Sequence, residues 1–186
     1  LFAEYVASVK RDELTVTPWT VAKVDSYKTT GGTRLEKQAD GSLLRVGNTP
    51  AKDTYRIVAT AAKTGITAVR LEAMTHESFP RGGPGLAGNG NFCLTDFHVR
   101  AIGSKEESRP VQITGARVTH EQDQGQLSVK ASFDSDTEKT GWAVDRGGIG
   151  KHQAAVFVFD KPISFDTGAE FTFTLRFNHP NTKHAL

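Results

Sequence analysis

Short segments in which apolar and polar residues alternate follow one another along the chain after Pro18. In the clearest, residues 170–177, three Phe and one Leu alternate with Glu, Thr and Arg. Residues 127–133 alternate in the same way. Successive side chains of a strand point to opposite faces, so a period of two is typical of a strand covered on one face. The pattern therefore predicts antiparallel sheets with one apolar and one solvated face.

About ten such segments follow each other without an intervening helical pattern. They are joined by turn residues, among them Asp40-Gly41, which predicts a hairpin. The expected strands span residues 19–27, 33–38, 42–47, 55–61, 66–74, 91–102, 111–119, 127–133, 142–144, 154–159 and 171–177. The sequence therefore predicts an all-β fold, a two-sheet antiparallel β-sandwich.

The first residues differ from the rest, because the apolar side chains between Phe2 and Val9 have helical spacing. We interpret residues 1–16 as a linker or the end of a helix from an upstream domain, and residues 17–186 as the β-sandwich domain. A length of 186 residues suits one such domain. The chain lacks an initiator Met, so we expect it to be a piece of a longer protein.

Charge, hydropathy and cysteine usage exclude several classes of protein. The 23 basic and 21 acidic residues give a net charge of +2, which argues against nucleic acid as a partner. No apolar run approaches the roughly 18 residues of a membrane span. The single cysteine, Cys93, excludes an internal disulfide, a zinc ribbon and a CxxCH haem attachment site. We expect Cys93 to be a small buried apolar residue.

A glycine-rich segment runs from Arg81 to Asn91. A phosphate-binding loop would need a helix after the glycines, but a strand is expected there. The segment predicts an ordered loop with positive φ at several positions. Loops of a sandwich also carry binding residues. Arg81, Asn89 and Asn91 are candidates to bind a sugar, and capping of the turn is the alternative for the two Asn.

Trp142 lies in a second glycine-containing segment, together with Arg146 and His152. An exposed Trp flanked by cations suits sugar binding, because the C–H face of a sugar packs on an aromatic ring. The alternative is a core Trp at the start of a strand. Both interpretations stay open at this stage.

Acidic residues form one weak candidate metal site. Asp134, Asp136 and Glu138 alternate as in some calcium loops, although the glycine and distal Glu of an EF-hand are missing. A solvated hairpin turn is the alternative.

Glu72 and Asp96 lie within apolar strands, so each needs a partner, either an ion pair with Arg70 or Arg100 or a structural calcium ion.

Nothing in the sequence has the spacing of a catalytic site. The six histidines include no HExxH motif, and no Gly-x-Ser-x-Gly is present. His179 and His184 lie in a C-terminal tail that we expect to be mobile. The carboxylates of Glu72, Asp96, Asp134 and Asp136 are not brought across a cleft by local spacing. We therefore expect no catalytic residues.

Several motifs together resemble a known segment. They are residues 66–74, the Phe79-Pro80 and Gly83-Pro84-Gly85 runs, residues 88–97, Asp40-Gly41-Ser42, Asp53-Thr54-Tyr55, residues 141–144, and His152 with Val156-Phe157. The chain from about Trp19 to Phe177 resembles the β-rich segment of large planctomycete proteins that also carry cytochrome c-like domains. The resemblance implies a jelly-roll, galactose-binding-like fold, an exported parent protein, and haem elsewhere in that parent. It also implies a final strand after Asn178, which this chain would lack.

These observations predict a non-catalytic carbohydrate-binding module of an exported, periplasmic or cell-surface, multidomain protein. Its expected partners are a polysaccharide or oligosaccharide and the flanking domains of the parent chain. The site would comprise Trp142, Arg146 and His152, with Asn89, Asn91 and Arg81. The alternative is a structural or interaction domain that positions neighbouring cytochrome c and other domains.

Overall fold

The computed structural model describes residues 19–103, 108–165, 168–181 and 183–186. The expected linker or helix at residues 1–16 lies outside the described residues. The described residues form an all-β structure in which every strand pairing is antiparallel. No helix among them is long and apolar enough to cross a membrane.

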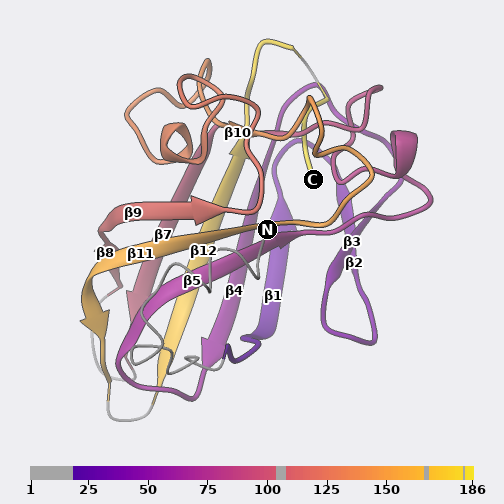
Figure 1. The fold of residues 1–186 in the computed structure, drawn as a ribbon. Helices are drawn as coiled ribbons and strands as arrows, with labels where there is room; N and C mark the ends of the chain where they lie inside the picture. Colours follow the sequence, from indigo (N-terminus) through magenta and orange to yellow (C-terminus); the bar gives the residue numbers. More distant parts are fainter. Residues whose placement is uncertain (1–18, 104–107, 166–167, 182) are drawn as a thin grey trace, which may run out of the picture.

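A five-stranded sheet forms one layer (Figure 1). Its order is β1 (Lys23–Thr29), β4 (Asp53–Ala61), β12 (Ala169–Phe177), β7 (Asp96–Ile102) and β8 (Arg109–Val111). The central strand β12 is the segment with the clearest alternation. Phe171, Leu175 and Phe177 are buried there, and Phe173 is partly buried against the same core. The predicted strand and its apolar face are thus confirmed.

The second layer is a three-stranded sheet, which crosses in front of the first in Figure 1. Its order is β5 (Ile66–Ala73), β11 (Gln153–Ile163) and β9 (Ile113–Val118). Two smaller pairs complete the fold: β2 (Arg34–Lys37) with β3 (Leu43–Val46), and β6 (Cys93–Leu94) with β10 (Trp142–Ala143). The predicted all-β sandwich is confirmed, and the hairpin predicted at Asp40-Gly41 joins β2 to β3.

Aromatic contacts hold the two sheets together. Phe97 on β7 and Phe157 on β11 are fully buried, and their ring centroids are 4.2 Å apart. Phe157 also meets Phe133 edge-on, with centroids 6.1 Å apart. Burying a Phe side chain contributes about 1.5–3 kcal/mol, and a well-placed ring pair adds about 1 kcal/mol. The sequence has 11 Phe, and the ten that lie within the described residues are all in this core or packed against it.

The prediction of a strand at residues 127–133 is wrong. These residues contain a short 3₁₀ helix, η3 (Val129–Ser132). Side-chain oxygens of the preceding turn accept hydrogen bonds from backbone N–H groups that would otherwise donate to a neighbouring strand. Asp123 Oδ1 accepts from Leu127 N at 2.9 Å, and Glu121 Oε2 accepts from Val129 N at 2.9 Å. Local acceptors of this kind compete with strand pairing.

Candidate functional site

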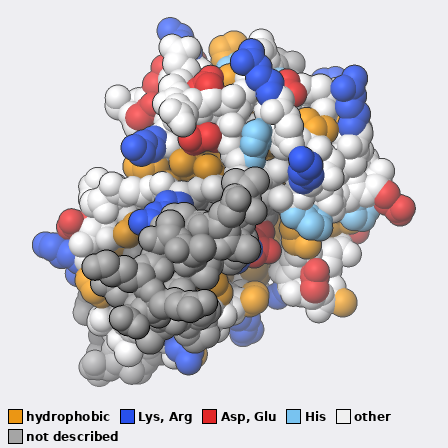
Figure 2. All heavy atoms as spheres, viewed as in Figure 1, with side chains coloured by type: hydrophobic (Ala, Val, Ile, Leu, Met, Phe, Trp, Pro, Cys, Tyr) orange, Lys and Arg blue, Asp and Glu red, His pale blue; other side chains and the backbone are white. Residues whose placement is uncertain are grey.

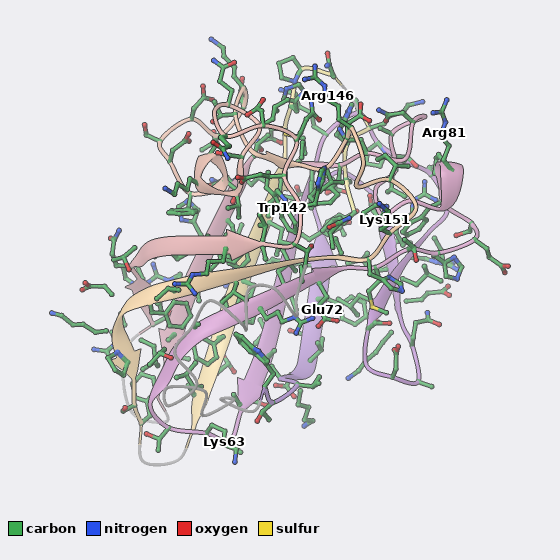
Figure 3. All side chains as sticks on the ribbon, in the orientation of Figure 1. Lys63, Glu72, Arg81, Trp142, Arg146 and Lys151 are labelled. Carbon is green, nitrogen blue, oxygen red and sulfur yellow. The ribbon has the colours of Figure 1, made fainter. Side chains whose placement is uncertain are left out.

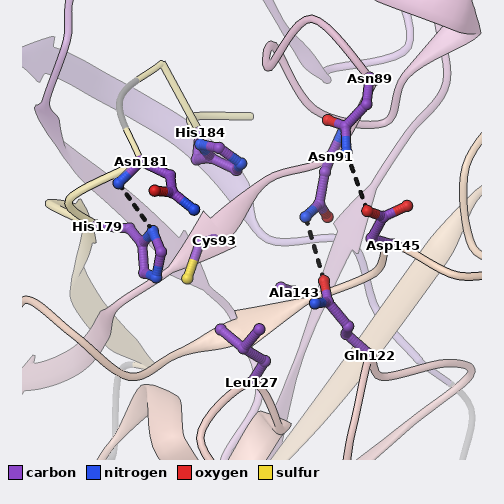
Figure 4. A pocket seen from close by; sticks show the side chains of 10 residues that line it. All are labelled: Asn89, Asn91, Cys93, Gln122, Leu127, Ala143, Asp145, His179, Asn181 and His184. Atoms are coloured by element: carbon purple, nitrogen blue, oxygen red, sulfur yellow. Dashed lines mark hydrogen bonds between the residues drawn. The ribbon is translucent and has the colours of Figure 1, made fainter.

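A polar cavity of about 130 Å³ opens at the end of the sandwich where β6 and β10 meet the C-terminal tail (Figure 4). Most of its lining side chains are amides, imidazoles or a carboxylate. The lining residues are Asn89, Asn91, Cys93, Gln122, Leu127, Ala143, Asp145, His179, Asn181 and His184. The cavity therefore draws on four separate segments of the chain, residues 89–93, 122–127, 143–145 and 179–184.

The glycine-rich loop brings Asn89 and Asn91 to the cavity. Gly90 between them has φ +85°, and a Cβ there would lie 2.6 Å from the Pro80 carbonyl oxygen. Only glycine fits such a position without strain. The prediction of an ordered loop with positive φ is thus confirmed, and the loop fixes the directions of the two amide side chains.

Hydrogen bonds hold one wall of the cavity in place. Asn89 Nδ2 donates to Asp145 Oδ2 at 3.0 Å, and Asn91 Nδ2 donates to Gln122 Oε1 at 3.3 Å. Asn91 is buried, and its Oδ1 accepts from Val144 N at 2.9 Å. Asn91 therefore acts mainly as a brace, whereas Asn89, Gln122 and Asp145 present the remaining polar atoms of this wall.

The C-terminal tail forms the opposite wall, so the expectation that it is mobile is wrong. Cys93 N donates to His184 O at 2.9 Å, and Leu86 N donates to Ala185 O at 3.0 Å. The Tyr55 hydroxyl donates to the backbone oxygen of Leu186 at 2.9 Å. Ala185 is buried. These contacts fix the backbone that carries His179, Asn181 and His184.

Two ionisable groups of the cavity, His179 and Cys93, are shifted toward their neutral forms. Burial lowers the pKa of His179, and the nearby His184 lowers it further, with the two ring centroids 5.8 Å apart. Burial raises the pKa of the Cys93 thiol to about 12. The prediction that Cys93 is a small buried residue is confirmed. At neutral pH His179 is therefore a neutral hydrogen-bonding group and Cys93 a protonated thiol.

Trp142 does not line this cavity, and its interpretation as a sugar-stacking platform is wrong. Its side chain is 0% exposed, and its ring meets Phe92 edge-on with centroids 4.8 Å apart. Its indole Nε1 donates to His120 O at 2.9 Å. Figure 3 shows it in the interior beneath the loops. A buried indole with its one donor satisfied is a core residue.

The predicted cations Arg81, Arg146 and His152 are exposed and do not line the cavity. Arg81 lies in the short 3₁₀ helix η2 (Pro80–Gly82), and Figure 3 shows it at the edge of the molecule. His152 Nδ1 accepts from Thr75 N at 2.9 Å. Figure 2 shows the Lys and Arg side chains of this view dispersed among acidic and uncharged ones. The three predicted residues therefore do not form one site with Trp142.

The candidate calcium loop is a turn held by its own side chains, as its alternative predicted, but it is not a hairpin, because it joins η3 to β10 and not two paired strands. Asp136 Oδ1 accepts from the backbone N of Glu138 and of Lys139, each at 2.9 Å. Asp134 accepts from Asp136 N at 2.8 Å and from Thr140 Oγ1 at 2.9 Å. Within the described ranges, no three His, Cys, Asp or Glu side chains are grouped so as to hold a metal ion.

The two carboxylates expected in apolar strands both have cationic partners. Glu72 pairs with Arg70 at 2.9 Å, as predicted, although its side chain is half exposed. Asp96 is buried and pairs with Arg176, and with His98 at 3.0 Å, so the expectation of Arg100 is wrong for this residue. The partners come from the register of β7 beside β12, which places Arg176 opposite Asp96.

Sequence reasoning found two of the cavity residues, Asn89 and Asn91, and missed the others. Gln122 and Asp145 follow ordinary strand ends and carry no motif. The tail offered one usable signal, since two His and two Asn occur between residues 178 and 184. That density of hydrogen-bonding side chains is typical of a segment that contributes to a site.

The chain matches no known protein-family model. No curated protein is significantly similar to it in sequence, and no solved structure matches it.

Proposed function

We propose that the chain is a non-catalytic carbohydrate-binding module whose loop-end cavity takes the hydroxyl-bearing edge of one sugar residue of a polysaccharide. The observation that carries this proposal is the lining of the cavity by amide and imidazole groups held in fixed directions. Sugar hydroxyls both donate and accept, and neutral amides and imidazoles offer both functions. Groups that are ordered before binding lose little entropy when the ligand arrives.

The size of the cavity limits the ligand. A volume of about 130 Å³ equals roughly four water molecules at about 30 Å³ each. Pockets for complete drug-sized ligands measure about 300–1,000 Å³. The cavity therefore suits part of a sugar ring, such as a chain end, with the rest of the polymer outside. The resemblance to exported multidomain proteins supports a jelly-roll module that serves a larger parent chain.

A glycan panel with calorimetry tests the proposal through Asn181→Ala and Gln122→Ala. Each variant removes one amide from the cavity wall, and we expect at least a tenfold loss of affinity for the best glycan, equivalent to about 1.4 kcal/mol. Gln112→Ala removes an exposed amide at the β8–β9 corner and should bind as the unmodified protein does. Failure of every glycan to bind, or normal binding by both cavity variants, would contradict the proposal.

A second candidate function, an interaction domain that positions neighbouring domains, is favoured by one observation. Trp19 and Val21 are 50% and 85% exposed, although both are large and apolar. Exposed apolar side chains that lie together mark contact surfaces. The double variant Trp19→Ser, Val21→Ser should then lose capture of flanking domains of the parent chain while its glycan binding is unchanged. Equal capture by the variant and the unmodified protein would exclude this surface.

A further inference from the structure

The outer face of the five-stranded sheet carries cations in register. Strand pairing places Lys28 of β1 opposite Arg56 of β4, Arg56 opposite Thr174 of β12, and Thr174 opposite His98 of β7. Two residues further along each strand, and therefore on the same side of the sheet, the pairing places Thr172 of β12 opposite Arg100 of β7. We call the five residues Lys28, Arg56, His98, Arg100 and Thr174 the basic face.

The basic face points away from the core. The adjacent row across the same strands consists of Tyr27, Ile57, Phe173 and Val99, all of which pack in or against the core. Successive residues of a strand point to opposite sides, so the row that contains Arg56 faces outward. Lys28, Arg56, His98 and Arg100 are all exposed, and the His98 side chain is 58% exposed.

Few carboxylates neutralise these cations. Lys28 and Arg56 make no ion pair with any residue that the structure describes. The Arg100 guanidinium donates to Ser108, to its Oγ at 3.1 Å and to its carbonyl oxygen, and both partners are uncharged. Two carboxylates of β7 and β12 share this side of the sheet. Asp96 is buried and pairs with Arg176 and His98. Glu170 of β12 is exposed, lies diagonal to Arg100 in the register, and makes no ion pair with a described residue. A net charge of only +2 for the whole chain therefore conceals a locally cationic surface.

We infer that the basic face binds an acidic polysaccharide, which extends the proposed function because it takes the same class of ligand. Neighbouring strands lie about 4.8 Å apart, so Arg56 and Arg100, two strands apart, present charge over about 10 Å. Guanidinium groups bind carboxylates and sulfates through paired hydrogen bonds. Thr172 and Thr174 lie between them on β12 and offer hydroxyls to the sugar. A chain lying across the strands would meet these groups in succession.

Nucleic acid fits this surface less well. The outer rows that contain Arg56 and Arg100 hold no Phe, Tyr or Trp on which the bases of a single strand would stack. Their one aromatic ring is the His98 imidazole, which pairs with Asp96. Binding to duplex DNA rests on neutralising many phosphates, whereas this face offers three permanent cations. The acidic polysaccharide is therefore the occupant that the charges and hydroxyls favour.

Polygalacturonate tests the inference, with its methyl-esterified form as the uncharged comparison. The double variant Arg56→Gln, Arg100→Gln removes two charges from the basic face. We expect it to bind polygalacturonate at least tenfold more weakly. The control Lys63→Gln, Lys161→Gln removes two exposed charges from outside this face and should stay within twofold of the unmodified protein. Binding should weaken as salt rises from 50 to 300 mM, because salt screens exposed charges.

The outcomes separate this inference from the proposed function. Unchanged binding in the Arg56→Gln, Arg100→Gln variant, an equal loss in the control, or tighter binding of a single-stranded oligonucleotide than of polygalacturonate would overturn the basic face as a polysaccharide site. If Asn181→Ala abolishes binding of a neutral glycan but not of polygalacturonate, both proposals stand. If no neutral glycan binds while polygalacturonate binds through Arg56 and Arg100, only the cavity proposal fails. Melting temperatures confirm folding of each surface variant, which should be nearly unaffected.

Discussion

At the scale of single residues, Trp142 illustrates how neighbours in sequence and neighbours in space differ. Arg146 and His152 follow it closely in the chain and are exposed, whereas the indole itself lies against Phe92 and donates to the His120 carbonyl. The groups that contact Trp142 are the Phe92 ring, just before β6, and the His120 carbonyl, just after β9, and neither segment is adjacent to Trp142 in sequence. Its role is therefore set by tertiary packing.

This burial predicts a stability effect for Trp142→Ala. Truncating a buried Trp removes apolar burial and leaves a cavity, which costs about 3–5 kcal/mol. The His120 carbonyl oxygen also loses its indole donor. We expect urea unfolding to show this loss of unfolding free energy, and Trp142→Phe to show a smaller one. Arg146→Ala, at an exposed position, should unfold as the unmodified protein does. Unchanged stability in Trp142→Ala would contradict the core assignment.

At the scale of elements, the C-terminal tail acts as a wall of the cavity and as a cover for Cys93. Ala185→Asp places a carboxylate at a position that is 2% exposed. An unpaired buried charge is costly, so we expect the tail to detach. The Cys93 thiol, whose pKa burial raises to about 12, should then react faster with iodoacetamide at pH 8, because exposure restores the pKa of a free thiol. Mass spectrometry measures the alkylation rate.

Lys183→Asp is the matched control for this prediction. Lys183 is exposed, and its contact with the rest of the fold is a backbone hydrogen bond from its N to the Ala51 oxygen at 2.8 Å, which the substitution leaves in place. Its Cys93 should remain as slow to react as in the unmodified protein. Fast alkylation of the unmodified protein itself would show that the tail does not cover Cys93.

The strands that sequence predicted well are those whose alternation reflects one buried face. In β12, every second side chain enters the core, and the pattern is visible locally. Residues 127–133 have the same alternation but a different structure, because Asp123 and Glu121 supply the hydrogen-bond acceptors. Periodicity does not distinguish a strand from a segment whose backbone is bound by side chains of a preceding turn.

The candidate site was less predictable, because its polar pairs are distant in sequence. Asn89 pairs with Asp145, 56 residues away, and Asn91 with Gln122, 31 residues away. The Asn and Gly residues of the loop identified one member of each pair, Asn89 or Asn91. The other side depends on how β6 pairs with β10 and on where the tail lies. No local pattern specifies either arrangement.

At the scale of the whole molecule, stability as a function of pH sums over every group whose pKa changes on folding. The contribution of Asp96 to stability changes with pH in the direction opposite to that of most paired carboxylates. Burial raises its pKa above the ordinary 3.8, although His98 and Arg176 act against this. One of its oxygens, Oδ1, has no hydrogen-bond partner among the described residues. The folded state therefore binds this proton more tightly than the unfolded state does, and the stability that Asp96 contributes is present below pH 3.8 and lost as pH rises through its folded pKa.

Comparing the unmodified protein with Asp96→Asn isolates the contribution of the Asp96 site, because groups that do not interact with Asp96 cancel in the difference between the two unfolding free energies. Asn carries no titratable proton, so we expect the unmodified protein to lose stability relative to the variant as pH rises from 3 to 5.5. Chemical denaturation at several pH values measures the difference. Glu72→Gln, at a half-exposed carboxylate, is the control and should give a much flatter curve. A difference that rises with pH would mean that the bonds from Arg176 and His98 outweigh the burial of Asp96 and lower its pKa.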